Sequence, residues 1–181
     1  PKGKRAFDAE FMGGVYEKSF MVEVMDFDNL PQPSKQRISL GRNLEGCRIG
    51  FDAGASDRKV TAMIDGEVVF SEEVVWNPKT QTDPKYHLDE IMNALRTAAS
   101  HMPRVEAIGV SAAGIYINNR VRVASLFRGV PRDLFKRKVT NLFLDIKKEW
   151  GDIPLEVVHD GDVAALAGAM SLNDTKVLGI A

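Results

Sequence analysis

The chain has 181 residues, 44% of them hydrophobic, which is enough for one sizeable core but not for many domains. Its 24 basic and 25 acidic residues leave a net charge of −1, so we expect neither nucleic acid nor a membrane as a partner. The one cysteine, Cys47, cannot form an internal disulfide, and no signal peptide or membrane helix is visible, which favours a cytoplasmic protein.

Residues 1–46 form a mixed segment whose function the sequence does not indicate. Residues 20–25 are apolar enough to form a strand, and the stretch at 31–34 predicts a loop. The Phe, Tyr and Met content favours an N-terminal extension that packs on the main body, residues 47–181. Because the chain starts with Pro1 and ends in an uncapped strand-like run, we expect the natural polypeptide to continue.

A regular pattern starts at Cys47 with three consecutive strands, predicted over residues 47–53, 57–64 and 67–75. Asp65 and Gly66 between the second and third strands are a strong two-residue hairpin signal. We therefore expect an antiparallel meander of three strands.

Helices and strands alternate after the meander. Asp83 and Pro84 supply a cap and a first-turn proline for a helix that ends near Pro103. The remaining predicted elements are a buried strand (105–111), a helix from Arg132 to Trp150 ended by Gly151, a strand (155–158), a small-residue helix (164–170) and a strand (177–180). This order predicts a layered α/β fold.

The turn between the first two strands carries chemistry-bearing residues. Asp52 lies at the end of a buried strand, where its carboxylate can hold a hydrated Mg²⁺. Gly54 and Ala55 let backbone N–H groups approach a phosphate, and Ser56 supplies one further donor. An ordinary β-turn uses the same residue types, so that interpretation stays open.

Two further sites follow later strands: the turn Ala112-Ala113-Gly114, and Asp160. Ligands of open α/β sheets bind at the carboxyl ends of strands, so we expect these sites to join the first turn in one site. A glycine needed only for the turn would explain Gly114 equally well. The alternative for Asp160 is that it only caps the following helix, a role that Asp162 could also fill.

Residues 47–181 resemble the first lobe of the actin-like, hexokinase-like ATPases, and in particular the ROK family of repressors, open reading frames and sugar kinases. Residues 52–56 are similar to the family's Asp-x-Gly-Gly-Thr, residues 108–114 to its strand ending in Pro-Gly, and residues 157–168 to its Asn-Asp-Ala-Asn and alanine-rich helix. The resemblance implies a ribonuclease-H-like lobe, in which a three-stranded antiparallel meander and alternating helices and strands build a mixed sheet. The second lobe would lie beyond Ala181, with the second phosphate loop and the family's zinc-binding cysteines.

The resemblance also implies ATP and Mg²⁺ as cofactors and phosphorylation of a sugar or sugar derivative. The residues it matches to the phosphate motif are Asp52, Gly54, Ala55 and Ser56, with Asp52 holding Mg²⁺ through water. Asp160 takes the place of the general base that accepts the proton of the sugar hydroxyl. The residues at the implied sugar site are Ala113, Gly114, His159 and Asp160, and we add Arg128 as a candidate for an anionic substituent.

The chain departs from the family pattern at several of these positions. Ala113 stands for proline, and His159 and Asp162 stand for asparagines. Residues 123–129 contain no asparagine where the family presents one to the sugar, so plain glucose is not the expected substrate. His159 as an ordinary polar residue, and Arg128 as a solvated surface residue, remain alternatives.

A non-catalytic sugar-binding or regulatory protein is the main alternative function, because ROK repressors share this core. Residues 1–46 show neither two helical periods nor a basic face, which argues against DNA binding. An activator of a radical enzyme would need a cluster of cysteines, and only Cys47 is present. His87 and His101 have no partner at metal-ligand spacing, so we expect surface or capping positions for both. The sequence leaves open whether the protein forms a homo-oligomer.

Overall fold

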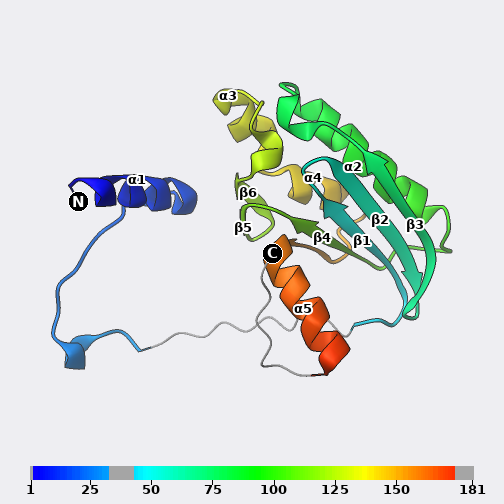
Figure 1. Cartoon of the computed structure of the whole chain (residues 1–181), viewed down its shortest axis with the longest axis horizontal. Coiled ribbons are helices and arrows are strands. Elements are labelled where there is room, and N and C mark those ends of the chain that lie inside the picture. The colour runs from blue at the N-terminus through cyan, green and yellow to red at the C-terminus, as the bar shows by residue number, and fades with distance from the viewer. Residues whose placement is uncertain (1, 33–42, 174–181) are drawn as a thin grey trace. The chain divides into compact units, whose positions relative to one another are not determined.

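A computed structural model of the protein describes residues 2–32 and 43–173 (Figure 1). The chain divides into two compact units, residues 1–39 and 40–181, and each is described by itself. The predicted strand at 177–180 and part of the loop at 31–34 lie outside the described residues.

The N-terminal unit contains a helix that the sequence analysis did not predict. Helix α1, Lys4–Tyr16, is followed by a 3-10 turn at Phe27–Asn29. Phe7 and Phe11 stack with their ring centroids 5.8 Å apart, as expected for side chains four residues apart on a helix. Residues 20–25 form no strand, so that expectation was wrong. A strand needs a neighbour to accept and donate its backbone hydrogen bonds, and no described strand pairs with this segment.

The second unit is built on a five-stranded mixed sheet in the order β3-β2-β1-β4-β7. Its strands are β1 (Cys47–Ala53), β2 (Asp57–Ile64), β3 (Glu67–Val75), β4 (Ala107–Ala112) and β7 (Leu155–His159). Strands β1, β2 and β3 pair antiparallel, whereas β1–β4 and β4–β7 pair parallel. The predicted meander and mixed sheet are confirmed. Asp65 and Gly66 have φ values of 50° and 87°, as a tight two-residue hairpin requires.

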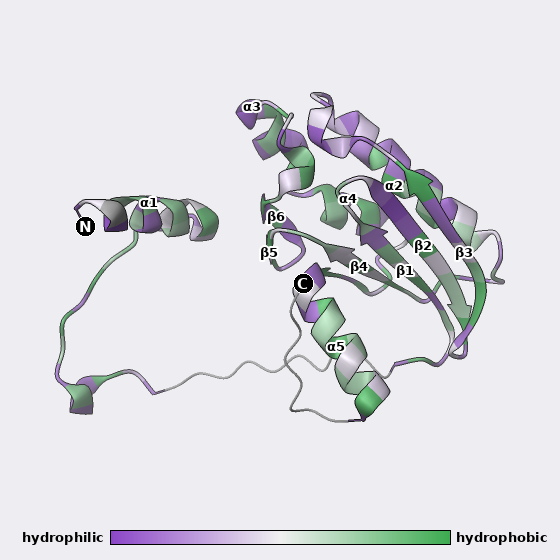
Figure 2. Cartoon of the chain, in the orientation of Figure 1, coloured by the Kyte–Doolittle hydropathy of each residue, from purple (hydrophilic) through white to green (hydrophobic). Residues whose placement is uncertain are grey.

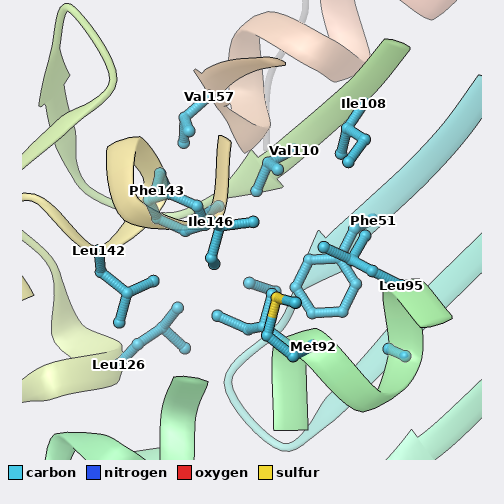
Figure 3. Packing of buried hydrophobic residues seen from close by; sticks show 14 of the residues in the cluster. Phe51, Met92, Leu95, Ile108, Val110, Leu126, Leu142, Phe143, Ile146 and Val157 are labelled. Carbon is cyan, nitrogen blue, oxygen red and sulfur yellow. The ribbon is translucent and has the colours of Figure 1, made fainter. Parts of the chain in front are cut away.

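One face of the sheet packs against α2 (Pro84–Ala99) and α4 (Leu142–Glu149), as Figure 3 shows. Asp83 caps α2 by accepting a hydrogen bond of 2.9 Å from the Lys85 N–H, and Pro84 occupies the first turn, as predicted. The core side chains labelled in Figure 3 come from both helices and three strands and include Phe51, Met92, Leu95, Val110, Phe143 and Ile146. Cys47 is a free, buried cysteine, as expected.

The helix predicted from Arg132 to Trp150 is interrupted. A short helix α3, Arg132–Leu134, leads into a π-helical turn, Phe135–Val139, before α4 starts. The Thr140 N–H donates to the Phe135 carbonyl at 3.0 Å, and the Thr140 carbonyl accepts from the Val121 N–H at 3.0 Å. The second bond takes the Thr140 carbonyl out of the helical ladder, which explains the break.

Val121 belongs to a hairpin that was not predicted, formed by β5 (Ile115–Ile117) and β6 (Arg120–Val123). Asn118 and Asn119 form its turn with φ values of 51° and 61°. The Asn119 side chain continues into the main sheet, donating to the Leu155 carbonyl at 2.9 Å and accepting from the Val157 N–H at 2.8 Å. The hairpin is therefore attached to the edge of β7.

Helix α5, Asp160–Leu172, lies against the sheet face opposite α2 and α4 (Figure 1). Beyond its first turn it is coloured mostly green to white in Figure 2, since small and apolar residues dominate it. Among the described residues, no helix has both the length and the apolar character needed to span a bilayer.

Candidate functional site

The register of three neighbouring strands aligns the predicted motifs. Ala53 of β1 is paired with Ala112 of β4, and Ala112 is paired with His159 of β7. Two strand spacings amount to about 10 Å, so the residues that follow these three positions lie along one short edge of the sheet. Those residues are the turn 54–56, the turn Ala113-Gly114 and Asp160.

The turn between β1 and β2 is tight and its backbone is partly unsatisfied. A Cβ at Gly54 would lie 2.5 Å from the Asp57 carbonyl oxygen, so a glycine is needed there. Ala55 and Ser56 are exposed, and no described residue accepts a hydrogen bond from their N–H groups. Two free N–H groups in a turn are suitable donors for an anionic oxygen.

Asp52 lies beside this turn, with Lys59 as its register partner on β2. The Lys59 ammonium bonds to the Asp57 carboxylate at 2.7 Å and lies 3.6 Å from Glu73. The hydrogen bond from Lys59 lowers the pKa of Asp57, and the same bond raises the pKa of Lys59. Asp52 itself makes no ion pair with another described residue, so its carboxylate remains available to a cation.

The Asp52 carboxylate and the free N–H groups of the turn suit Mg²⁺ better than a metal ion that takes all its ligands from protein side chains. Within residues 2–32 and 43–173, no group of three or more His, Cys, Asp or Glu side chains could hold an ion. Mg²⁺ keeps most of its water and commonly binds to one or two carboxylates and to substrate phosphates. Asp52 beside the free N–H groups of the turn provides that arrangement.

A cavity of about 510 Å³ opens on the α5 face of the sheet. Gly50 and Gly109 are register partners in its floor, and a Cβ on either would meet open space. Its lining residues are Gly50, Phe51, Asp52, Lys59, Thr61, Gly109, Val110, Ser111, Glu156, Val158, Val163 and Leu166. Asp52 is the one predicted site residue in this lining, so the cavity extends away from the predicted sugar site.

Asp160 is the first residue of α5, and its carboxylate accepts a 2.8 Å hydrogen bond from the Gly161 N–H. The same N–H donates to His159 Nδ1 at 3.0 Å, and His159 is the N-cap residue of the helix. The N-cap position therefore belongs to His159 and to neither Asp160 nor Asp162, although the Asp160 carboxylate accepts a bond from the same first-turn N–H. His159 Nδ1 also lies 3.0 Å from the Asp160 carboxylate oxygen, so the two predicted site residues are in direct contact.

Tyr116 was missed by the sequence analysis and lies at the same edge. Its hydroxyl donates to the Ala113 carbonyl at 3.4 Å, and its ring packs edge-on against Phe143. Burial raises the pKa of Tyr116 above its usual range, and the charge of Asp160 raises it further. The hydroxyl is thus a neutral donor close to the Asp160 carboxylate. The asparagine pair after Tyr116 was the available signal, because it marks a hairpin turn.

Gly114 has a structural reason for being glycine. Its φ is 144°, and a Cβ there would lie 2.4 Å from the Val123 carbonyl oxygen. The Ala113-Gly114 turn therefore packs directly against the end of β6, where the segment 124–129 begins.

Arg128 is exposed on that segment, and its side chain makes no ion pair with another described residue. Leu126 and Phe127, however, are each only 2% exposed and belong to the core. The segment beside Gly114 therefore contributes Leu126 and Phe127 to the core and leaves Arg128 at the surface.

The two histidines of the α2 region differ in exposure. His87 is fully buried, and its Nε2 lies 3.0 Å from both the Pro78 and Leu126 carbonyl oxygens. Because carbonyls only accept, Nε2 carries the proton and donates to both. The surface position expected for His87 is wrong, whereas His101 is exposed and stacks on Phe70.

No protein-family model and no curated protein matches this sequence. Among solved structures, the chain is similar to a glucokinase from Parabacteroides distasonis, with 17% identity and a TM-score of 0.55 over 71% of this chain and 35% of that chain. It is also similar to an inorganic polyphosphate/ATP-glucomannokinase from Arthrobacter sp. strain KM, with 23% identity and a TM-score of 0.52 over 69% of this chain and 48% of that chain. The chain thus spans less than half the length of each.

These similarities concern the fold. The α/β lobe described above is the ribonuclease-H-like, actin-like ATPase fold that the resemblance to ROK sugar kinases implied. The roles of the individual site residues stay predictions.

Proposed function

We propose that this chain is the N-terminal lobe of a ROK-type sugar kinase, which transfers the terminal phosphoryl group of ATP to a hydroxyl of a sugar or sugar derivative. The observation that carries the proposal is the alignment of Ala53, Ala112 and His159, which puts three motifs at one sheet edge. Two sugar kinases with the same fold support it. A cytoplasmic location is part of the proposal, because the free thiol of Cys47 suits a reducing compartment.

In this proposal the turn after β1 binds the phosphates of ATP. The N–H groups of Ala55 and Ser56 and the Ser56 hydroxyl donate to phosphate oxygens. Gly54 keeps the turn tight enough for this approach. The Asp52 carboxylate would hold Mg²⁺ through water, and the bound ion would neutralise charge on the phosphates.

Asp160 acts as the general base. The sugar hydroxyl oxygen forms a bond to the terminal phosphorus of ATP while the bond from that phosphorus to the leaving ADP oxygen breaks. The hydroxyl proton passes to the Asp160 carboxylate, which later releases it to water. The Gly161 N–H, 2.8 Å from this carboxylate, holds it in place at the start of α5.

The sugar lies against Ala113 and Gly114, with His159 and Arg128 as further contacts. His159 in place of an asparagine changes the hydrogen-bonding groups of the site. A site that depends on hydrogen bonds rejects ligands that leave its polar groups unpaired. We therefore expect a substituted or differently configured sugar to be preferred over plain glucose.

The test is ATP-dependent phosphorylation of a panel of hexoses, amino sugars and sugar acids by the intact protein. Replacing Asp160 with Asn keeps the shape and removes the base, so turnover should fall by about a hundredfold or more. Asp145→Asn is the matched control, since Asp145 lies in the first turn of another helix, α4, outside the three motifs, and should matter little. Near-parental turnover by the Asp160 variant would reduce Asp160 to a structural role.

A sugar-binding regulator without kinase activity is the second candidate. The contact of His159 Nδ1 with the Asp160 carboxylate favours it, because a neighbour absent from the family pattern touches the proposed base. Sugar binding measured by calorimetry without any ATP turnover would support this candidate over the kinase.

A further inference from the structure

We propose that Trp76 is a positioning residue of the phosphate-binding turn: it holds the Gly54 and Ser56 carbonyls, so that the Ala55 N–H faces the phosphates of ATP. This inference rests on the proposed kinase function. Trp76 follows β3 and lies 22 residues from Gly54 in the sequence, outside every motif discussed above.

Two hydrogen bonds join Trp76 to the turn. The indole Nε1–H donates to the Gly54 carbonyl at 2.9 Å, and the backbone N–H donates to the Ser56 carbonyl at 3.0 Å. The Trp76 side chain is 2% exposed, so water does not compete freely for these bonds. A single residue therefore fixes the carbonyls on both sides of Ala55.

The Gly54 carbonyl and the Ala55 N–H belong to one planar peptide group, so the direction of the carbonyl determines the direction of the N–H. In a trans peptide the carbonyl of one residue and the N–H of the next point to opposite sides. Because the Gly54 carbonyl points to the indole, the Ala55 N–H points away from it. No described residue accepts a hydrogen bond from that N–H, which leaves it free for a ligand.

Trp76 is itself held in place by α2. Its ring stacks on Tyr86 and meets the edge of His87, each with a centroid distance of 6.5 Å. The Tyr86 hydroxyl accepts a 3.2 Å hydrogen bond from the N–H of Asn77, the residue after Trp76. The turn is thus supported by a packed helix, and a donor oriented before the ligand arrives binds without a cost of reorganisation.

The chain contains a matched control for the indole N–H. Trp150, at the end of α4, has a buried Nε1 with no hydrogen-bond partner among the described residues. Replacing either tryptophan with phenylalanine removes an N–H and keeps most of the ring packing. Only the change at Trp76 removes a bond to the turn.

The experiment compares Trp76→Phe, Trp150→Phe and the unmodified intact protein in ATP-dependent sugar phosphorylation. We expect Trp76→Phe to raise the KM for ATP by about 5- to 10-fold, the effect of one hydrogen bond, with the KM for the sugar unchanged. Trp150→Phe should leave both constants unchanged. A merely structural role of Trp76 would lower the amount of active enzyme without this split between the two KM values.

Each outcome decides between the proposals. If the unmodified protein neither binds nor uses Mg²⁺-ATP, the proposed function fails and this inference fails with it. If the unmodified protein is active and Trp76→Phe has the same KM for ATP, only the inference fails.

A second measurement applies if Trp76→Phe does not fold. Tyr86→Phe keeps the ring beside Trp76 and removes the hydroxyl that accepts the hydrogen bond from the Asn77 N–H. A higher KM for ATP in this variant, with the KM for the sugar unchanged, supports the inference, and an unchanged KM for ATP overturns it.

Discussion

The two faces of the central sheet differ in what their side chains can do. The face under α2 and α4 carries Ile49, Phe51 and Val110, each 2% exposed and packed in the core. The α5 face carries Gly50, Asp52, Gly109 and Ser111, which line a cavity. Successive residues of a strand point to opposite faces, so one strand serves both. In β1, residues that stabilise the core therefore alternate with residues on the face of the proposed chemistry.

The largest expected effect comes from breaking the packed face. Phe51→Ala removes a buried ring between α2 and the sheet, and it should lower the free energy of unfolding by about 3–5 kcal/mol. Denaturant unfolding of the intact protein measures this loss. Val75→Ala on β3 is the control, because Val75 is 79% exposed and its loss should cost less than about 0.5 kcal/mol.

Asp52, the residue after Phe51, should show the reverse pattern, a large loss of turnover with little loss of stability. Asp52→Asn removes the carboxylate proposed to hold Mg²⁺, and ATP-dependent turnover should fall by about a hundredfold or more. Its free energy of unfolding should change by less than about 0.5 kcal/mol. Unchanged turnover, measured at saturating sugar and varied ATP, would remove Asp52 from the phosphate site.

Substitutions of Gly54 and Gly109 test the same comparison with smaller expected changes in stability. Gly54→Ala places a Cβ 2.5 Å from the Asp57 carbonyl oxygen and should cost about 1–3 kcal/mol of stability. Gly109→Ala meets open space in the cavity and should stabilise the strand by about 0.5 kcal/mol. Equal effects of the two substitutions on the denaturation midpoint would contradict the close contact at the turn.

The smallest expected effect is electrostatic. The pKa of Asp57 is lowered by its hydrogen bond from Lys59, so this pair contributes its full stability above the ordinary pKa of Asp57. The contribution is lost as the pH falls through the lowered pKa. It is also lost at high pH, as the pH rises through the raised pKa of Lys59. Lys59→Met should weaken both dependences in denaturant unfolding at low salt, and a pH profile identical to that of the parent would contradict the pair.

Most of the sheet could be predicted from the sequence, because its signals are local. Asp65-Gly66 sets the β2–β3 turn, and the ends of β1, β2 and β3 agree with their predicted residues. The alignment of Asp52, Gly114 and Asp160 along one edge also followed from a general rule of α/β sheets.

The missed features depend on contacts between distant residues. The break before α4 depends on a hydrogen bond from Val121 to Thr140, which no helical periodicity reveals. The burial of His87 depends on the Leu126 carbonyl, 39 residues away. Trp76 likewise acts on Gly54 through tertiary structure, and its own neighbours in the sequence carry no motif.

The Asn119 side chain has a consequence for assembly. Its amide bonds to the backbone of β7 as a short extra strand would, so the backbone groups of Leu155 and Val157 are already occupied. Another chain that extended the sheet at this edge would first have to displace the amide. At the opposite edge, β3 carries Glu67, Glu72 and Glu73, of which Glu72 and Glu73 pair with Arg58 and Lys59 of β2. Charged side chains along an edge strand oppose its pairing with another chain. One edge is thus protected by a hydrogen-bonded cap and the other by charge.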